Sequence, residues 1–228
     1  KTIKGLKSKN IIVEPSGKDT AAAIGLAALH IKKLQEDAVM SVFPADHLIV
    51  GAQKFEKTVR SAIQLANKKD SLVTIGMEPT CPATGYGYIQ YDRNSPENYL
   101  NGFKVKTFAE KPHRDLAKQF IDSGEFLWNG GMFVWKVSTF FKKIEKHMAD
   151  LNDQLGKIEK KIATKQDFTR LWNNIKPESI DYGLMEKSDD IYVVKAEFDW
   201  NDLGSWDTVF DISPKSKGKN VIRGEGVD

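Results

Sequence analysis

Short apolar runs and segments of helical period alternate along the first third of the chain. Residues 11–13, 39–43 and 72–76 are apolar runs of strand length, rich in β-branched side chains. Between them, apolar residues recur every three or four positions, as in amphipathic helices. The first stripe is Ile24, Ala27, Ala28, Ile31 and Leu34, and the second is Phe55, Val59, Ala62, Ile63 and Ala66. The order strand, helix, strand, helix, strand predicts right-handed crossovers and parallel strands.

The pattern changes after residue 77. Residues 86–91 and 103–109 alternate like the two strands of an antiparallel hairpin, so the sheet is expected to be mixed. A short helix over 116–121 is expected to end at Gly124, and an apolar stripe over 137–148 predicts a longer helix. The charged residues 150–174 are expected to be mostly helical, and 191–195 to return to strand.

Composition and charge narrow the class of protein. A chain of 228 residues that is 40% hydrophobic can bury a substantial core. The net charge of +3 comes from scattered residues rather than a basic arm, so we expect no nucleic-acid partner. Cys81 is the only cysteine, which excludes an internal disulfide and favours a reducing, cytoplasmic location. No apolar run approaches the roughly 20 residues of a membrane span, so no membrane partner is expected.

Two aspartates are candidates for a metal site. Asp46 follows the strand expected to end at Phe43, and Pro44 stops that strand. Ligands of α/β sheets bind beyond the carboxyl ends of the strands, although a turn aspartate would look the same. Asp202 stands on a turn next to Gly204. Two carboxylates and substrate phosphate oxygens would suit Mg²⁺, whereas the alternative for Asp202 is a cap on a helix over 205–210.

Other polar residues follow predicted strands or precede glycines. Glu110 and Lys111 could bind a sugar hydroxyl and a phosphate, or form a surface ion pair. Asn129 and Gly85 belong to glycine-containing segments that allow close backbone approach to a ligand, or only a tight turn. Residues 14–20 could present amides and a helix N-terminus to a ligand, or simply cap the helix. We find no nucleophile with a partnered base.

Six motifs, in this order and spacing, resemble the mannose-1-phosphate guanylyltransferase family of sugar-nucleotide pyrophosphorylases. They are Glu14-Pro15 with Asp19-Thr20-Ala21, Phe43-Pro44-Ala45-Asp46-His47, Thr84-Gly85-Tyr86-Gly87-Tyr88-Ile89, Phe108-Ala109-Glu110-Lys111-Pro112, Trp128-Asn129-Gly130-Gly131-Met132-Phe133 and Asp199-Trp200-Asn201-Asp202-Leu203-Gly204-Ser205-Trp206. The resemblance runs over nearly the whole chain. It implies an α/β, Rossmann-like fold of the nucleotide-diphospho-sugar transferase type, with a mixed, mainly parallel sheet and helices on both faces.

The resemblance also implies a reaction and its residues. Mannose 1-phosphate attacks the α-phosphorus of GTP, which gives GDP-mannose and pyrophosphate without a covalent enzyme intermediate. The implied catalytic residues are Asp46, Lys111 and Asp202, and the two aspartates would also hold Mg²⁺. The implied substrate-binding residues are Glu110, Asn129 and Gly85 for mannose, with Glu14 and Thr20 in the loop that faces guanine.

The family pattern also sets limits. Its glycine-rich G-x-G-x-R-x-x-P loop, followed by a lysine, has no counterpart in residues 1–10, so we expect further residues upstream and very weak turnover without them. Residues 1–212 are expected to form the catalytic domain, and 213–228 a linker and the start of a C-terminal β-helix. The alternatives are another sugar-1-phosphate nucleotidyltransferase or a non-catalytic, sugar-nucleotide-binding regulatory subunit. A homo-oligomer is one expectation, since the sequence leaves the oligomeric state open.

Overall fold

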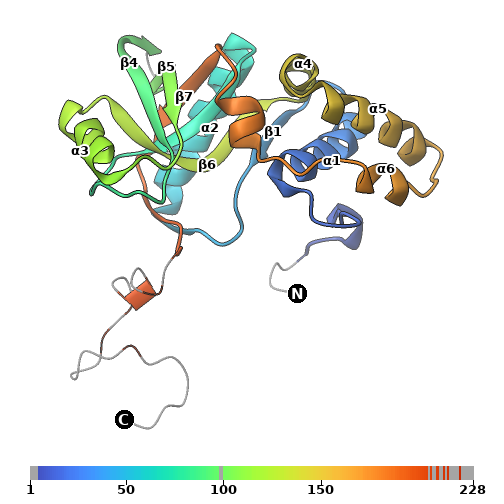
Figure 1. Ribbon diagram of the computed structural model, residues 1–228, viewed down its shortest axis with the longest axis horizontal. Coiled ribbons are helices and arrows are strands. Elements are labelled where there is room, and N and C mark those ends of the chain that lie inside the picture. The colour runs from blue at the N-terminus through green and yellow to red at the C-terminus, as the bar shows by residue number, and fades with distance from the viewer. Residues whose placement is uncertain are drawn as a thin grey trace.

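The computed structural model describes residues 5–97, 100–204, 206, 209–210, 213, 215 and 221. Helices and strands are interspersed along the chain (Figure 1). The helices are α1 (Asp19–Leu34), α2 (Ala52–Lys69), α3 (Arg114–Ser123), α4 (Val137–His147), α5 (Ala149–Ala163) and α6 (Thr169–Asn173), with a 3-10 turn η1 (Ser8–Asn10) and a π-helical turn η2 (Asp181–Met185). The strands are β1 (Val39–Val42), β2 (Leu48–Val50), β3 (Leu72–Met77), β4 (Tyr88–Glu97), β5 (Gly102–Ala109), β6 (Phe126–Lys136), β7 (Ile191–Lys195) and β8 (Asp199–Asn201).

Six strands form the main sheet in the order β1-β6-β3-β7-β5-β4, with β4 also paired to β6. The pairings place β1, β3, β4 and β7 in one direction and β5 and β6 in the other. The mixed α/β fold is therefore confirmed, with most strands sharing a direction. Strands β1 and β3 are parallel as expected, but β6 lies between them. As a result, β3 and β7 are the only parallel neighbours among the described strands.

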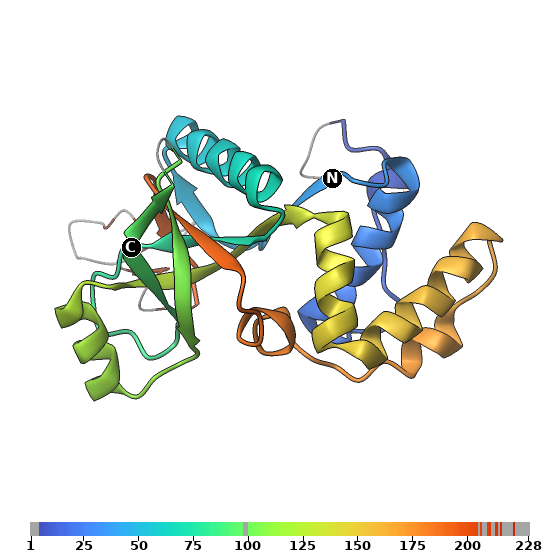
Figure 2. The same ribbon diagram turned by 90° about the horizontal axis from the view of Figure 1, so that it is seen from above.

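Two cores lie on the two faces of this sheet, as the alternation of side chains along its strands requires. On β6, Phe133 and Trp135 join the core beneath α1, α4, α5 and α6, whereas Val134 joins the core beneath α2 and α3. On β7, Val193 and Val194 divide in the same way. Helices therefore cover both faces, with α1, α4, α5 and α6 gathered to one side of the sheet (Figure 2).

Two expectations for the start of the sheet are wrong. Residues 11–13 form no strand in the structure, and all three side chains are exposed. Strand β1 runs in the same direction as β3 but is not the buried strand expected, because its described neighbour is the antiparallel β6 and only Met40 of its four residues is buried. Asp46 therefore follows a half-buried strand at the edge of the described sheet.

No helix in the described part of the chain combines the length and the apolar character of a membrane span.

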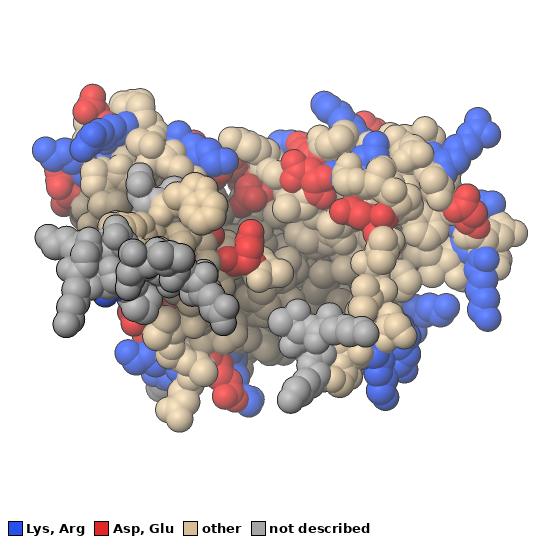
Figure 3. Space-filling model, turned by 90° about the horizontal axis from the view of Figure 1, so that it is seen from below, with Lys and Arg blue, Asp and Glu red and all other residues tan. Residues whose placement is uncertain are grey.

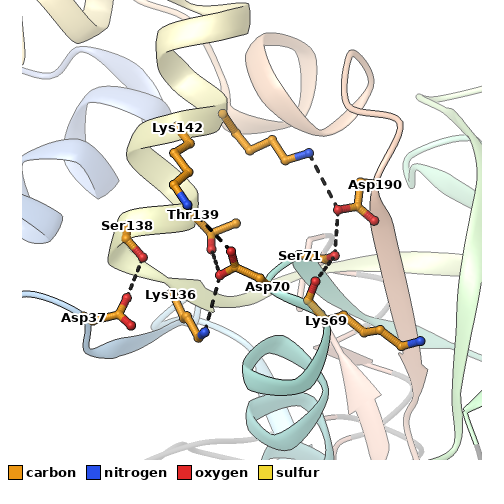
Figure 4. A network of polar contacts seen from close by, with 10 residues as sticks. Asp37, Lys69, Asp70, Ser71, Lys136, Ser138, Thr139, Lys142 and Asp190 are labelled. Atoms are coloured by element: carbon orange, nitrogen blue, oxygen red, sulfur yellow. Dashed lines mark hydrogen bonds and ion pairs between the residues drawn. The ribbon is translucent and has the colours of Figure 1, made fainter.

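A polar network fastens the start of α4 to the turn between α2 and β3 (Figure 4). The hydroxyl of Thr139 donates to Asp70 Oδ1 at 2.7 Å, and the ammonium of Lys136 lies 3.4 Å from the same oxygen. Next to Asp70, the hydroxyl of Ser71 donates to Asp190 Oδ2 at 2.7 Å. These contacts join segments that lie far apart in the sequence.

Candidate functional site

A pocket of about 210 Å³ collects most of the candidate residues. Its walls come from the segments that follow β1, β5 and β8, from the turn before β4 and from the glycines inside β6. The candidates Gly85, Glu110, Lys111, Asn129 and Asp202 all line it. The face shown in Figure 3 is hollowed near its centre, and Asp and Glu side chains stand around the hollow.

A small second sheet brings Asp202 towards the Asp46 loop. Strand β2 pairs antiparallel with β8, with Leu48 opposite Asn201. If this register is continued by one residue, His47 stands opposite Asp202. Asp46 itself is exposed, and it and Asp202 are the two carboxylates whose charges act on His47. Asp46 and Asp202, far apart in the sequence, therefore both lie near His47, but only Asp202 lines the pocket, and a metal held by the two carboxylates stays a prediction.

Asp202 is held by neighbouring groups. The hydroxyl of Tyr86 donates to Asp202 Oδ1 at 2.8 Å, and the amide of Gly204 donates to the same oxygen at 3.1 Å. Burial, followed by the contact with Asp202, raises the pKa of Tyr86, so its hydroxyl stays protonated and keeps donating. The Tyr86 ring lies edge-on to Trp128 and Trp200. Asp202 thus forms a local turn, and it also lines the pocket.

The donors around the two aspartates suit a hard cation. His47 Nδ1 accepts a hydrogen bond of 3.0 Å from the indole N–H of Trp200, so the neutral ring carries its proton on Nε2 and has no free lone pair for a metal. Burial lowers the pKa of His47 and favours this neutral ring. Among the described residues, no group of three or more His, Cys, Asp or Glu side chains could hold a metal. A pair of carboxylates fits Mg²⁺, which keeps waters and binds substrate phosphates, better than it fits zinc.

Glu110 and Lys111 stand together at the end of β5. The ammonium of Lys111 lies 3.3 Å from Glu110 Oε1, and the Lys111 side chain is 60% exposed whereas that of Glu110 is 16% exposed. Burial and then the charge of Asp181 raise the pKa of Glu110, and Lys111 opposes this. Lys111 has φ +46°, an uncommon backbone conformation for a residue with a side chain. An exposed cation beside a mostly buried carboxylate can serve an anion and a hydroxyl at once.

The glycines in the segments around Gly85 and Asn129 differ in whether the structure requires a glycine at their position. A Cβ on Gly87 would lie 2.4 Å from Glu110 Oε2, so this glycine makes room for the carboxylate. Gly131 has φ +63°, which favours glycine. A Cβ on Gly85 would meet nothing within 4 Å, and its φ is not in the left-handed region. Packing therefore does not require a glycine at position 85, which is compatible with close approach of a ligand.

Asp181 belongs to this site, although the sequence analysis did not select it. Its Oδ1 accepts a hydrogen bond of 2.7 Å from the side-chain amide of Asn129, and it lines the pocket beside Glu110 and Lys111. Burial raises its pKa, and the bond from Asn129 opposes the rise. No strand ends at Asp181, and the sequence analysis did not select the segment around Gly183, two residues later. The π-helical turn that it begins is a structure often found at functional sites, but it has no sequence signature.

The structure does not bring Glu14 and Thr20 into this pocket. The hydroxyl oxygen of Thr20 accepts a hydrogen bond of 2.8 Å from the amide of Ile180. Nearby, the indole of Trp172 donates to the carbonyl of Ser16, so the loop packs against α6. Glu14 Oε2 is buried without a hydrogen-bond partner among the described residues. Contact of the loop over residues 14–20 with the guanine base stays a prediction.

Comparison with known proteins decides the family. The family model described as Nucleotidyl transferase matches residues 2–218. The chain belongs to the nucleotidyl transferase family. A mannose-1-phosphate guanylyltransferase of Escherichia coli is 38% identical over 223 residues, which covers 95% of this chain and 48% of the relative. One from Klebsiella pneumoniae is 37% identical over 222 residues, 96% of this chain and 47% of the relative.

A solved structure of a similar protein agrees with the fold. The Thermus thermophilus protein described as a mannose-1-phosphate geranyltransferase superposes with a TM-score of 0.83 at 28% identity. The match covers 94% of this chain and 61% of that protein. The chain spans about half the length of the curated relatives that it matches. The resemblance seen in the motifs is confirmed at the level of the family.

Proposed function

We propose that the protein transfers a guanylyl group from GTP to mannose 1-phosphate and forms GDP-mannose and pyrophosphate. The observation that carries this proposal is the pocket that joins Asp202, Lys111, Glu110 and Asn129 in a chain of the nucleotidyl transferase family. Relatives named mannose-1-phosphate guanylyltransferase, at 37–38% identity, support the choice of base and sugar.

The chemistry is a direct displacement at phosphorus. A phosphate oxygen of the sugar phosphate forms a bond to the α-phosphorus of GTP, and the bond to the oxygen of the leaving pyrophosphate breaks. Such reactions depend mainly on positioning and on stabilisation of charge, which agrees with the lack of a nucleophile partnered by a base. Lys111, with its exposed ammonium, neutralises the phosphate of the sugar. Glu110 accepts from a sugar hydroxyl, and the Gly85 backbone allows the sugar to approach closely.

Asp46 and Asp202 would hold Mg²⁺. When bound, the ion supplies positive charge to the phosphate oxygens. Tyr86 orients Asp202 through its hydrogen bond to Oδ1. Glu14 and Thr20, in the loop before and at the start of α1, remain our candidates for the guanine side. A cytoplasmic location is proposed from the single free cysteine, and a homo-oligomer stays a prediction.

A substrate panel tests the proposal. The full-length protein is incubated with Mg²⁺, with GTP, ATP, CTP or UTP, and with mannose or glucose 1-phosphate, and pyrophosphate release is measured. We expect the highest kcat/KM for GTP with mannose 1-phosphate. A preference for UTP and glucose 1-phosphate would reject the choice of substrates. No turnover with any pair, together with binding of GDP-mannose, would instead support a regulatory subunit.

A further inference from the structure

Asp181 fixes the side chain of Asn129 in one orientation. The backbone amide of Gly131 donates to Asn129 Oδ1 at 3.2 Å, and because a backbone N–H can only donate, the acceptor must be the side-chain oxygen. The Asn129 nitrogen therefore faces Asp181 Oδ1, at 2.7 Å. Its second hydrogen has no partner among the described residues. Since Asn129 lines the pocket, it can offer a ligand a donor rather than an acceptor.

The contact is built from two distant parts of the chain. Ile180 donates its amide to the Thr20 hydroxyl at 2.8 Å, and the amide of Ala21 donates to the carbonyl of Glu178 at 3.3 Å. The first turn of α1 thus holds the segment that leads into Asp181. This arrangement places the carboxylate against Asn129 before any ligand binds.

The donor of Asn129 lies beside an acceptor. A Cβ built on Gly87 would lie 2.4 Å from Glu110 Oε2 and 3.4 Å from Asn129 Cβ, so the two side chains flank the same glycine. The pocket therefore presents a carboxylate oxygen and an amide hydrogen from two residues that adjoin the same glycine. Neighbouring sugar hydroxyls can satisfy both groups in one configuration, and a sugar that leaves one of them unpaired is rejected.

We propose that Asp181 is a positioning residue for sugar recognition: it holds Asn129 so that an amide hydrogen, next to the Glu110 carboxylate, meets a hydroxyl of the sugar phosphate. This inference rests on the proposed function. It adds a residue that shapes selection of the sugar through another side chain. Burial disfavours the charge on Asp181, and the bond from Asn129 offsets part of that cost.

Removing and then restoring the acceptor tests the proposal. In Asp181→Ala, we expect the KM for mannose 1-phosphate to rise roughly 10- to 100-fold, with the KM for GTP changed less than about twofold. Asp181→Asn should recover most of this loss, because its Oδ1 can still accept from Asn129. Asp189→Asn, at a largely exposed carboxylate, is the matched control and should leave both constants unchanged. Equal losses in the two Asp181 variants, or a parallel rise in both KM values, would overturn the inference.

A swap separates the orientation of Asn129 from the stability of the fold. Asn129→Asp sets two carboxylates against each other and should lower the thermal midpoint. Adding Asp181→Asn rebuilds the hydrogen bond in the opposite direction and should restore the midpoint, but it offers the sugar no N–H from position 129. We therefore expect the KM for mannose 1-phosphate to stay high in the double variant. Recovery of this KM along with the midpoint would reject the role of the donor.

The wild-type protein distinguishes the two proposals. If it turns over no sugar phosphate with any nucleotide, the proposed function fails and this inference fails with it. If the wild type is active and Asp181→Ala has the same KM for mannose 1-phosphate, only the role of Asp181 is rejected.

Discussion

At Gly87, the absence of a side chain leaves room for the carboxylate of Glu110. Because a Cβ there would lie 2.4 Å from Glu110 Oε2, we expect Gly87→Ala to push this carboxylate aside and to raise the KM for mannose 1-phosphate by about tenfold or more. Gly156→Ala is the control, since a Cβ at that position meets nothing within 4 Å. Steady-state kinetics on the full-length protein would check this. An unchanged KM in Gly87→Ala would argue against Glu110 as a sugar ligand.

The charge of Glu110 makes a prediction about pH. Its pKa is raised above 4.5 by burial and by Asp181, so it gains a proton earlier than an ordinary glutamate as the pH falls. Protonation removes the best hydroxyl acceptor, and mannose 1-phosphate affinity should then fall. Glu110→Gln should bind more weakly at neutral pH and should lack this part of the pH dependence. Titration calorimetry on both proteins gives the comparison, and coincident pH profiles would contradict the assignment.

Among the elements, the start of α4 depends on its contact with the turn between α2 and β3. Thr139 is buried and donates to Asp70, so Thr139→Val should lower the free energy of unfolding by about 1 kcal/mol. Thr107→Val, at an exposed hydroxyl that bonds only to the next residue, should cost much less. Urea unfolding monitored by tryptophan fluorescence measures both. Equal effects would show that the Thr139 contact adds nothing.

The same contact predicts how stability depends on pH. The hydrogen bond from Thr139, helped by Lys136, holds the pKa of Asp70 below its usual 3.8 in the folded protein. Because the pKa of Asp70 is lower in the folded protein than in the unfolded chain, its charged form stabilises the fold at pH values above the unfolded-state pKa. This stabilisation is lost as the pH falls through the folded-state pKa. Thr139→Val should therefore lose less stability than the wild type as the pH falls through this window. Urea unfolding of both proteins over a series of acidic pH values measures the difference, and parallel curves would contradict this account.

Elements with strong local signals could be predicted from the sequence. The strand over 191–195 matches β7, and Gly124 ends α3 in the left-handed conformation that glycine favours. Residues 11–13 have the composition of a strand, yet strand formation needs a pairing partner, and the described chain provides none. Strands β2 and β8 have three residues each, which is too short to give a periodic signal in the sequence. They also lie far apart in the chain, so their pairing could not be predicted from local pattern.

The site residues also divide into those that the sequence could predict and those that it could not. Glu110, Lys111, Asn129 and Asp202 stand beside prolines or glycines in recognisable motifs, and the structure brings them to one pocket. Asp181 has a glycine two residues later, Gly183, but follows no predicted strand, and its place in the pocket depends on tertiary contacts from α1 and β6. The segment expected to begin a β-helix lies almost wholly outside the described residues, and the domain division at 212 stays a prediction.

At the scale of the whole molecule, the site lies where the second sheet meets the main one. Strand β2 follows the Asp46 loop and pairs with β8, which leads into Asp202, while Glu110 follows β5 and Asn129 lies on β6. Chain segments from both halves of the sequence therefore have to fold before the pocket exists. Such a pocket suits the proposed reaction, which needs two substrates held together by groups from separate parts of the chain.

Turnover by Asp202→Asn in the full-length protein is the most direct test. The substituted amide would keep an acceptor for Tyr86 but lose the charge for Mg²⁺, so we expect pyrophosphate release from GTP and mannose 1-phosphate to fall at least about 100-fold, with the thermal midpoint retained. Asp199→Asn, at an exposed side chain on β8, should remain active. Near-normal Mg²⁺-dependent turnover by Asp202→Asn would contradict the proposed site.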